Sequence, residues 1–161
     1  ESPDWEQAII TKFPSGYLFQ KHVMEDPILR SKWETREAHW KTPYVWFGQS
    51  TSSSQEINTM DDNRVKFLHA MQFKKPNGQS LVSGFDSQVK TIKSNHDVMS
   101  HGEWSVTLTC MGYYVKYEEI RLESAPSLEA YSDIVTEPIW EIASRDREKG
   151  LTDETFTAVM M

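Results

Sequence analysis

The strictest constraint on the fold comes from residues 65–91, where the odd-numbered positions carry most of the large apolar side chains on both sides of a Pro-Asn-Gly triplet. Such alternation is typical of β-strands with one buried face. The triplet at 76–78 suits a three-residue turn with glycine in the left-handed position. The pattern therefore predicts an antiparallel hairpin. The side chains on its inner face are Val65, Phe67, His69, Met71, Phe73, Leu81, Phe85 and Val89.

A histidine on this apolar face is the most informative residue of the chain. The predicted register places His69 opposite Phe85, with Ser83 and Ser87 diagonal to it. Buried polar groups need hydrogen-bond partners, so the patch predicts an internal network or the wall of a wet cavity. Because imidazole changes its charge near neutral pH, His69 is the candidate catalytic residue, as a general acid or base. A core histidine with its partners inside the protein, and two serines with purely structural roles, are the alternative.

Residues 102–122 predict one long strand that is bent near its middle. The apolar positions change parity between Cys110 and Tyr113, which is what a β-bulge at Gly112 would produce. A long bent strand favours a curved sheet around a core or a cavity. The aromatic residues of the predicted strands suit the wall of a ligand site. The expected ligand-binding residues are Ser83, Ser87, Phe85, Trp46, Trp104, Tyr113 and Tyr117.

Helices are predicted where start signals precede amphipathic runs. Asp26-Pro27 and a similar signal at Ser2-Pro3 mark two of these starts. The expected helices cover 2–13, 26–41, 128–135 and 139–150, and further strands are expected at 16–23 and 44–48. These elements predict an α+β fold in which a strongly curved antiparallel sheet, nearly closed into a barrel, carries helices at its ends or open face.

Composition limits the partners and the location. A chain of 161 residues with 38% hydrophobic and 25% charged residues is typical of one globular domain, 1–161. A net charge of −7 counts against nucleic acid and anionic membranes as partners. No apolar run approaches the length of about 20 residues that crosses a bilayer. The first ten residues lack a signal-peptide pattern, and Cys110 is the only cysteine, so we expect a cytoplasmic protein.

The sequence contains none of the common catalytic motifs. It has no P-loop, Gly-x-Ser-x-Gly, HExxH or CxxC pattern, which counts against the usual nucleotide, hydrolase and zinc classes. Four metal-capable residues occur close together, but their spacing matches no standard metal site. These four metal-capable residues are His96, Asp97, His101 and Glu103. We therefore expect no metal and no cofactor.

Three classes of function remain open. The first is a protein that holds a small hydrophobic or aromatic molecule inside the sheet, either as a cofactor-independent dehydratase, isomerase or cyclase that uses His69 or as its non-catalytic relative. The second is a non-enzymatic module that binds a ligand or a peptide. The third is an interaction or assembly protein, a homodimer included, that buries its aromatic residues against a partner. A water-accessible His69 favours the first class, and a filled interior favours the third.

Overall fold

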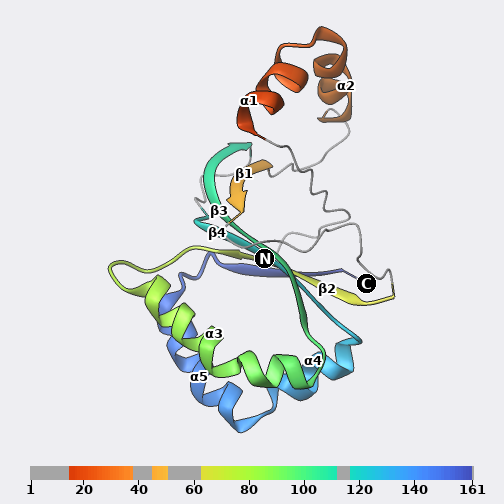
Figure 1. The fold of residues 1–161 in the computed structure, drawn as a ribbon. Coiled ribbons are helices and arrows are strands. Elements are labelled where there is room, and N and C mark those ends of the chain that lie inside the picture. Colours follow the sequence, from red (N-terminus) through yellow and green to blue (C-terminus); the bar gives the residue numbers. More distant parts are fainter. Residues whose placement is uncertain (1–14, 38–44, 51–62, 112–116, 161) are drawn as a thin grey trace. The chain divides into compact units, whose positions relative to one another are not determined.

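A computed structural model describes residues 15–37, 45–50, 63–111 and 117–160 of the chain (Figure 1). The contacts divide the chain into two units, residues 1–45 and 46–161, which we describe separately.

The first unit contains short helices. They are α1 (Gly16–Phe19), the π-helix η1 (Gln20–Met24) and α2 (Pro27–Glu37). The Asp26 carboxylate begins α2, because its Oδ1 accepts hydrogen bonds from the backbone N–H groups of Ile28 and Leu29, at 2.9 and 3.0 Å. The predicted helix at 26–41 is thus confirmed as far as Glu37. The strand predicted at 16–23 was wrong, and the helix predicted at 2–13 lies outside the described residues.

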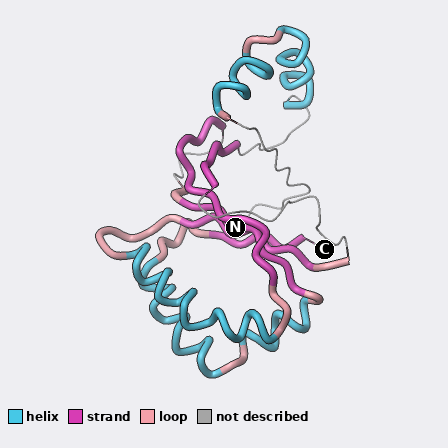
Figure 2. Tube along the Cα trace, in the orientation of Figure 1, coloured by secondary structure: helices cyan, strands magenta, loops and turns pink. Residues whose placement is uncertain are grey.

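The second unit is an α+β layer structure. The sheet order is β1-β3-β4-β2-β5, and helices α3, α4 and α5 cover one of its faces (Figures 1 and 2). The pairs β2–β4, β2–β5 and β3–β4 are antiparallel. The elements are β1 (Val45–Ser50), β2 (Val65–Met71), α3 (Gly78–Asn95), β3 (Met99–Met111), β4 (Glu119–Ala125), α4 (Leu128–Val135), α5 (Pro138–Gly150) and β5 (Phe156–Met160).

The predicted α+β class with an antiparallel sheet is confirmed, whereas the predicted barrel is not supported. The sheet is open, with β1 and β5 as its two edges. From β2 onward the chain runs β-α-β-β-α-α-β, which is the split βαβ arrangement with two helices, α4 and α5, in its second crossover. The helices predicted at 128–135 and 139–150 and the strand predicted at 44–48 are also confirmed.

The predicted hairpin was wrong, because its second half is the helix α3. Leu81, Phe85 and Val89 are spaced by four, a spacing that fits both the two-residue period of a strand and the 3.6-residue period of a helix. In α3 the buried side chains are Val82, Phe85 and Val89. Phe73 consequently bridges to Leu151 and does not pair with Leu81.

The single bent strand predicted at 102–122 was wrong as well. This stretch contributes to two strands, β3 and β4, which pair antiparallel with Ser105 opposite Glu119. The described irregularity lies earlier, where the register shifts between Ser100 and Gly102. Gly112 and Tyr113 lie outside the described residues.

Both faces of the central strands β2 and β4 are buried. On the face away from the helices, Leu68 and Ala70 pack with Ile120 and Leu122. On the face toward the helices, Phe67 stacks on Tyr131 of α4, with ring centroids 4.0 Å apart. The alternate positions of β4 on this second face are charged; Glu119 and Glu123 are buried there and Arg121 is half-buried. These positions build the site described below.

Two glycine substitutions are expected to change stability in opposite directions. A Cβ atom at Gly150 would lie 2.6 Å from the Gly78 carbonyl oxygen, whereas a Cβ at Gly84, inside α3, would meet nothing within 4 Å. Gly150→Ala should therefore cost about 1–3 kcal/mol of unfolding free energy. Gly84→Ala should add about 0.5–1 kcal/mol, because alanine loses less backbone entropy in a helix. Urea unfolding of both variants measures the two effects, and a stabilised Gly150→Ala would contradict the close approach of α3 and α5.

Candidate functional site

His69 lies on β2, between β4 and β5, on the face of the sheet that the helices cover. Its residue surface is 6% exposed. The ring Nδ1 is 2.8 Å from Thr157 Oγ1 on β5, and Nε2 is 3.5 Å from Glu123 Oε2 on β4. A carboxylate only accepts hydrogen bonds, so the proton belongs on Nε2, and the threonine hydroxyl then donates to Nδ1. Both ring nitrogens of His69 thus have a partner within the protein.

Glu123 carries the negative charge of this cluster. The Lys93 ammonium group of α3 donates to both of its carboxylate oxygens, at 2.7 and 2.9 Å. Burial opposes the charge of Glu123, but the hydrogen bond with His69 and the nearby Lys93 prevail and lower the pKa of Glu123 to about 2. For His69, burial disfavours the charged imidazolium more strongly than Glu123 favours it. The pKa of His69 is therefore lowered. At neutral pH the histidine is neutral and the glutamate is ionised.

A second charged cluster surrounds Arg121, the neighbour of His69 on β4. The guanidinium group is only 15% exposed, and it contacts the carboxylates of Asp86 and Glu119, with Glu103 at 3.7 Å. Burial raises the pKa of Glu119 in spite of the neighbouring arginine. Three carboxylates therefore share one buried cation.

A small cavity lies between these clusters and the helices. Its volume is about 20 Å³, which is room for about one or two water molecules and far below the roughly 300 Å³ of a typical ligand pocket. The sheet contributes one wall and the three helices contribute the other. The lining residues are His69, Met71, Arg121 and Glu123 from the sheet, Phe85, Asp86 and Lys93 from α3, Tyr131 from α4, and Trp140 and Arg147 from α5.

Aromatic rings form the helix side of this cavity. Trp140 meets the edge of Phe85 at 5.0 Å between ring centroids and that of Tyr131 at 6.1 Å. The pKa of Tyr131 is raised to about 12, mainly by burial and to a smaller extent by the negative charge of Glu123. The tyrosine is therefore un-ionised at neutral pH and can donate a hydrogen bond.

The structure brings together two of the residues expected from the sequence. His69 and Phe85 line the same cavity, although Phe85 arrives there from a helix and not from a paired strand. Ser83 and Ser87 are not diagonal to His69. They lie on the exposed side of α3, where each hydroxyl donates to the backbone carbonyl four residues earlier, at 3.0 and 2.9 Å.

Of the other aromatic residues expected on the strands around His69, the two whose side chains the structure describes lie elsewhere. Trp104 and Tyr117 pack in the apolar cluster on the opposite face of the sheet, where the Tyr117 hydroxyl donates to the Glu154 carbonyl at 3.2 Å. The side chain of Trp46 and all of Tyr113 lie outside what the structure describes.

Sequence reasoning missed the charged residues that surround His69. Glu119, Arg121 and Glu123 alternate with Ile120 and Leu122 along β4, and charges in such a pattern normally mark the solvent face of a strand. The sequence contains one signal, which concerns Lys93. Lys93 follows Val89 by four residues, and this helical spacing places the lysine in line with buried residues of α3.

The metal-capable residues near β3 have other partners. His101 Nε2 is 2.7 Å from Ser124 Oγ, and Arg64 contacts both Ser124 and Asp97. Within the described ranges, no group of three or more His, Cys, Asp or Glu side chains could hold a metal ion. No helix in the described part of the chain is both long and apolar enough to cross a bilayer.

Comparisons with known proteins define the fold and not the activity. No protein-family model and no curated protein matches the chain. A solved protein of unknown function from Rhodopseudomonas palustris matches with a TM-score of 0.56 and 10% identity, over 64% of this chain and 85% of that one. At this level of identity the likeness shows a shared fold alone.

Two further structures match more weakly. A candidate monooxygenase from Lactobacillus acidophilus has a TM-score of 0.45 and 15% identity, over 63% of this chain and 45% of that one. A dimeric protein of unknown function from Bacteroides fragilis, with a ferredoxin-like fold, has a TM-score of 0.42 and 10% identity, over 62% of this chain and 94% of that one. Scores this low carry no argument about function.

Proposed function

We infer that the second unit binds a small molecule with an aromatic or other apolar part at the cavity beside His69. The observation that carries this proposal is the set of ionisable side chains, with His69 and Glu123 buried among them, that line one cavity together with an aromatic wall. Buried ion pairs contribute little stability compared with apolar residues of the same volume. Ionisable groups with perturbed pKa values that converge on a cavity are therefore candidates for binding or catalysis.

The arrangement around His69 suits reversible proton transfer. The neutral imidazole can accept a proton at Nδ1 once the Thr157 hydroxyl rotates, and the Glu123 carboxylate 3.5 Å from Nε2 would stabilise the resulting cation. Moving a proton from one atom of a substrate to another needs no oxidant, which fits a dehydratase, isomerase or cyclase reaction. Binding without turnover would use the same cavity.

The small volume of the cavity sets a condition on this proposal. A ring-sized ligand requires more than about 20 Å³, so side chains at the cavity have to move when it binds. Lys93 and Arg147 can move aside, because their long side chains have many rotamers. We expect the cavity to widen on binding while the strands keep their places.

Phenol is a suitable probe of the role of His69, because it combines a ring with one hydroxyl. We expect His69→Phe to weaken phenol binding about tenfold, which corresponds to the loss of one hydrogen bond of about 1–1.5 kcal/mol. Ligand-observed NMR titration measures the affinity, and a thermal melt of the same samples measures stability. Tyr117→Phe is the matched control, because it removes a hydroxyl that donates to the Glu154 carbonyl, away from the cavity on the opposite face of the sheet.

The outcomes separate a binding residue from a structural one. Unchanged phenol binding by His69→Phe, together with a lower melting temperature, would show that His69 only fills the core. Failure of the wild-type chain to bind phenol would count against the proposal itself.

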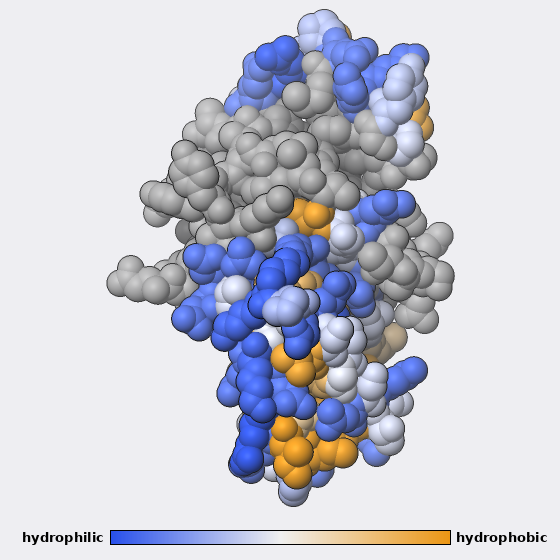
Figure 3. Space-filling model, turned by 90° about the vertical axis from the view of Figure 1, so that its left-hand side faces the viewer, coloured by the Kyte–Doolittle hydropathy of each residue, from blue (hydrophilic) through white to orange (hydrophobic). Residues whose placement is uncertain are grey.

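A second candidate function is assembly with another protein or a second copy, which the nearly filled interior favours. Figure 3 shows apolar side chains gathered on part of the surface of the second unit. Ile142 of α5 is 63% exposed, and Leu128 and Val135 of α4 and Ile139 of α5 are exposed as well. The molecular mass in solution, measured by light scattering, distinguishes a monomer from such an assembly.

A further inference from the structure

Within the part of the chain that the structure describes, one cation at the cavity has no carboxylate partner. Arg147 projects from α5, and its guanidinium carbon lies 5.6 Å from the centroid of the Phe85 ring. It makes no ion pair and no side-chain hydrogen bond with any residue that the structure describes. A guanidinium group offers five N–H donors and accepts no hydrogen bond, so a half-buried one leaves strong donors to be satisfied.

The other charges that line the cavity are matched. Lys93 pairs with Glu123 at 2.7 Å. Arg121 pairs with Asp86 and also contacts carboxylates that do not line the cavity. Three cations and two carboxylates therefore face the cavity, and the unmatched positive charge belongs to Arg147.

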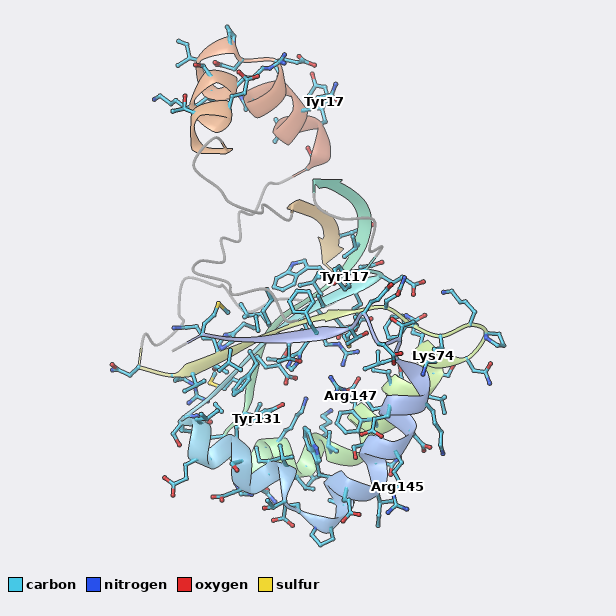
Figure 4. All side chains as sticks on the ribbon, turned by 180° about the vertical axis from the view of Figure 1, so that it is seen from behind. Tyr17, Lys74, Tyr117, Tyr131, Arg145 and Arg147 are labelled. Carbon is cyan, nitrogen blue, oxygen red and sulfur yellow. The ribbon has the colours of Figure 1, made fainter. Side chains whose placement is uncertain are left out.

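A second donor that lines the same cavity has no acceptor among the residues that the structure describes. The Tyr131 hydroxyl makes no hydrogen bond within the described residues, although its ring is fixed by stacking on Phe67. Figure 4 shows the side chains of Tyr131 and Arg147 on the sheet-facing side of the helices, while Arg145 lies on the outer side of α5. The two donors come from different helices and meet at one cavity.

We propose that the ligand carries a carboxylate, which Arg147 binds in a bidentate manner and to which Tyr131 donates a further hydrogen bond. The inference rests on the proposed function and adds the chemical class of the ligand. A planar carboxylate matches the fork of the guanidinium group, and both of its oxygens accept hydrogen bonds. The negative charge of Glu123 does not oppose this, because Lys93 compensates it.

The aromatic wall fixes where the rest of the ligand lies. Arg147 sits over the ring of Phe85, with Trp140 against the edge of that ring. When the guanidinium group swings toward a carboxylate, it leaves this ring face, and an aromatic part of the ligand takes its place. An aromatic carboxylate therefore satisfies the free donors and covers the ring that the arginine uncovers.

Benzoate and benzyl alcohol test the inference, because they share a ring and differ in charge. On the wild-type chain of 161 residues at pH 7, NMR titration should show benzoate binding at least about tenfold more tightly, as expected for charge-assisted hydrogen bonds. Arg147→Gln should reduce the affinity for benzoate to that for benzyl alcohol. Arg145→Gln should change neither affinity, because this arginine is exposed and pairs with Glu141 at 3.2 Å.

Each other outcome contradicts either the carboxylate inference alone or the small-molecule site as well. Benzyl alcohol binding as tightly as benzoate would overturn the carboxylate inference and leave the small-molecule site in place. Binding of neither probe would overturn both. An equal loss of benzoate affinity in Arg145→Gln would show a general effect of net charge and would also overturn the inference. The wild-type comparison needs no variant, so it decides the matter even if Arg147→Gln fails to fold, and Tyr131→Phe then supplies a second test with a smaller expected loss.

Discussion

Arg121→Met is expected to destabilise the protein by about 3–5 kcal/mol, the usual cost of removing one partner from a buried charge cluster. Methionine keeps most of the volume of the side chain, so the loss is electrostatic. Glu119, with a side chain only 7% exposed, would be left in the interior without its cation, and Asp86 would lose the same partner. Urea unfolding at pH 7 measures this loss.

The matched control for this prediction is an arginine on the surface. Arg145 is 68% exposed and pairs with an equally exposed Glu141, so Arg145→Met should change stability by no more than about 0.5 kcal/mol. Combining Arg121→Met with Glu119→Gln should restore part of the stability, because the stranded carboxylate is then gone. A loss below about 1 kcal/mol in Arg121→Met would show that water screens the cluster.

Elements with local signals could be predicted from the sequence. The helices α2, α4 and α5 begin at Pro27, after Ser127 and at Pro138, and these are start signals that act within one turn. β2 could be predicted too, because its alternating run is short and free of turn residues. In each case the interactions that decide the conformation lie within a few residues of one another.

The helix α3 could not be identified from the same kind of pattern. Its apolar residues recur at intervals of four, which is two strand periods and nearly one helix turn. Pro76-Asn77-Gly78 then suggested a hairpin, although Asn77 precedes the first residue of α3. What decides the matter is packing, since Val82 and Phe85 fill space beneath the sheet that a second hairpin strand would leave empty.

For the candidate site, the burial of His69 could be predicted from the sequence, but its partners could not. That His69 is buried followed from its parity in β2, and the structure confirms its burial. Its partners are Glu123 and Thr157, 54 and 88 residues further along the chain, and they become neighbours only through the strand order. A charged strand such as β4 is interpreted as solvent-facing unless helices are known to cover that face.

Glu123→Gln is expected to cost about 3 kcal/mol at pH 7. The carboxylate has a pKa of about 2 in the folded chain and an ordinary value of 4.5, and each unit of difference corresponds to about 1.4 kcal/mol of stability. The amide keeps the shape of the side chain but removes the charge that compensates Lys93, whose side chain is only 17% exposed. Urea unfolding of wild type and variant at pH 7 gives the difference.

Acid provides an independent check on the same residue. Because the folded pKa of Glu123 is lowered, its contribution is complete above about pH 4.5 and is lost as the pH falls toward about 2. At pH 3.5 the gap between wild type and Glu123→Gln should therefore be smaller by roughly 1 kcal/mol than at pH 7. Glu141→Gln, at an exposed carboxylate, should show no gap at either pH. A gap of the same size at pH 3.5 and pH 7 would mean that the carboxylate is not held ionised by His69 and Lys93, and the proton chemistry proposed for His69 would lose its counter-charge.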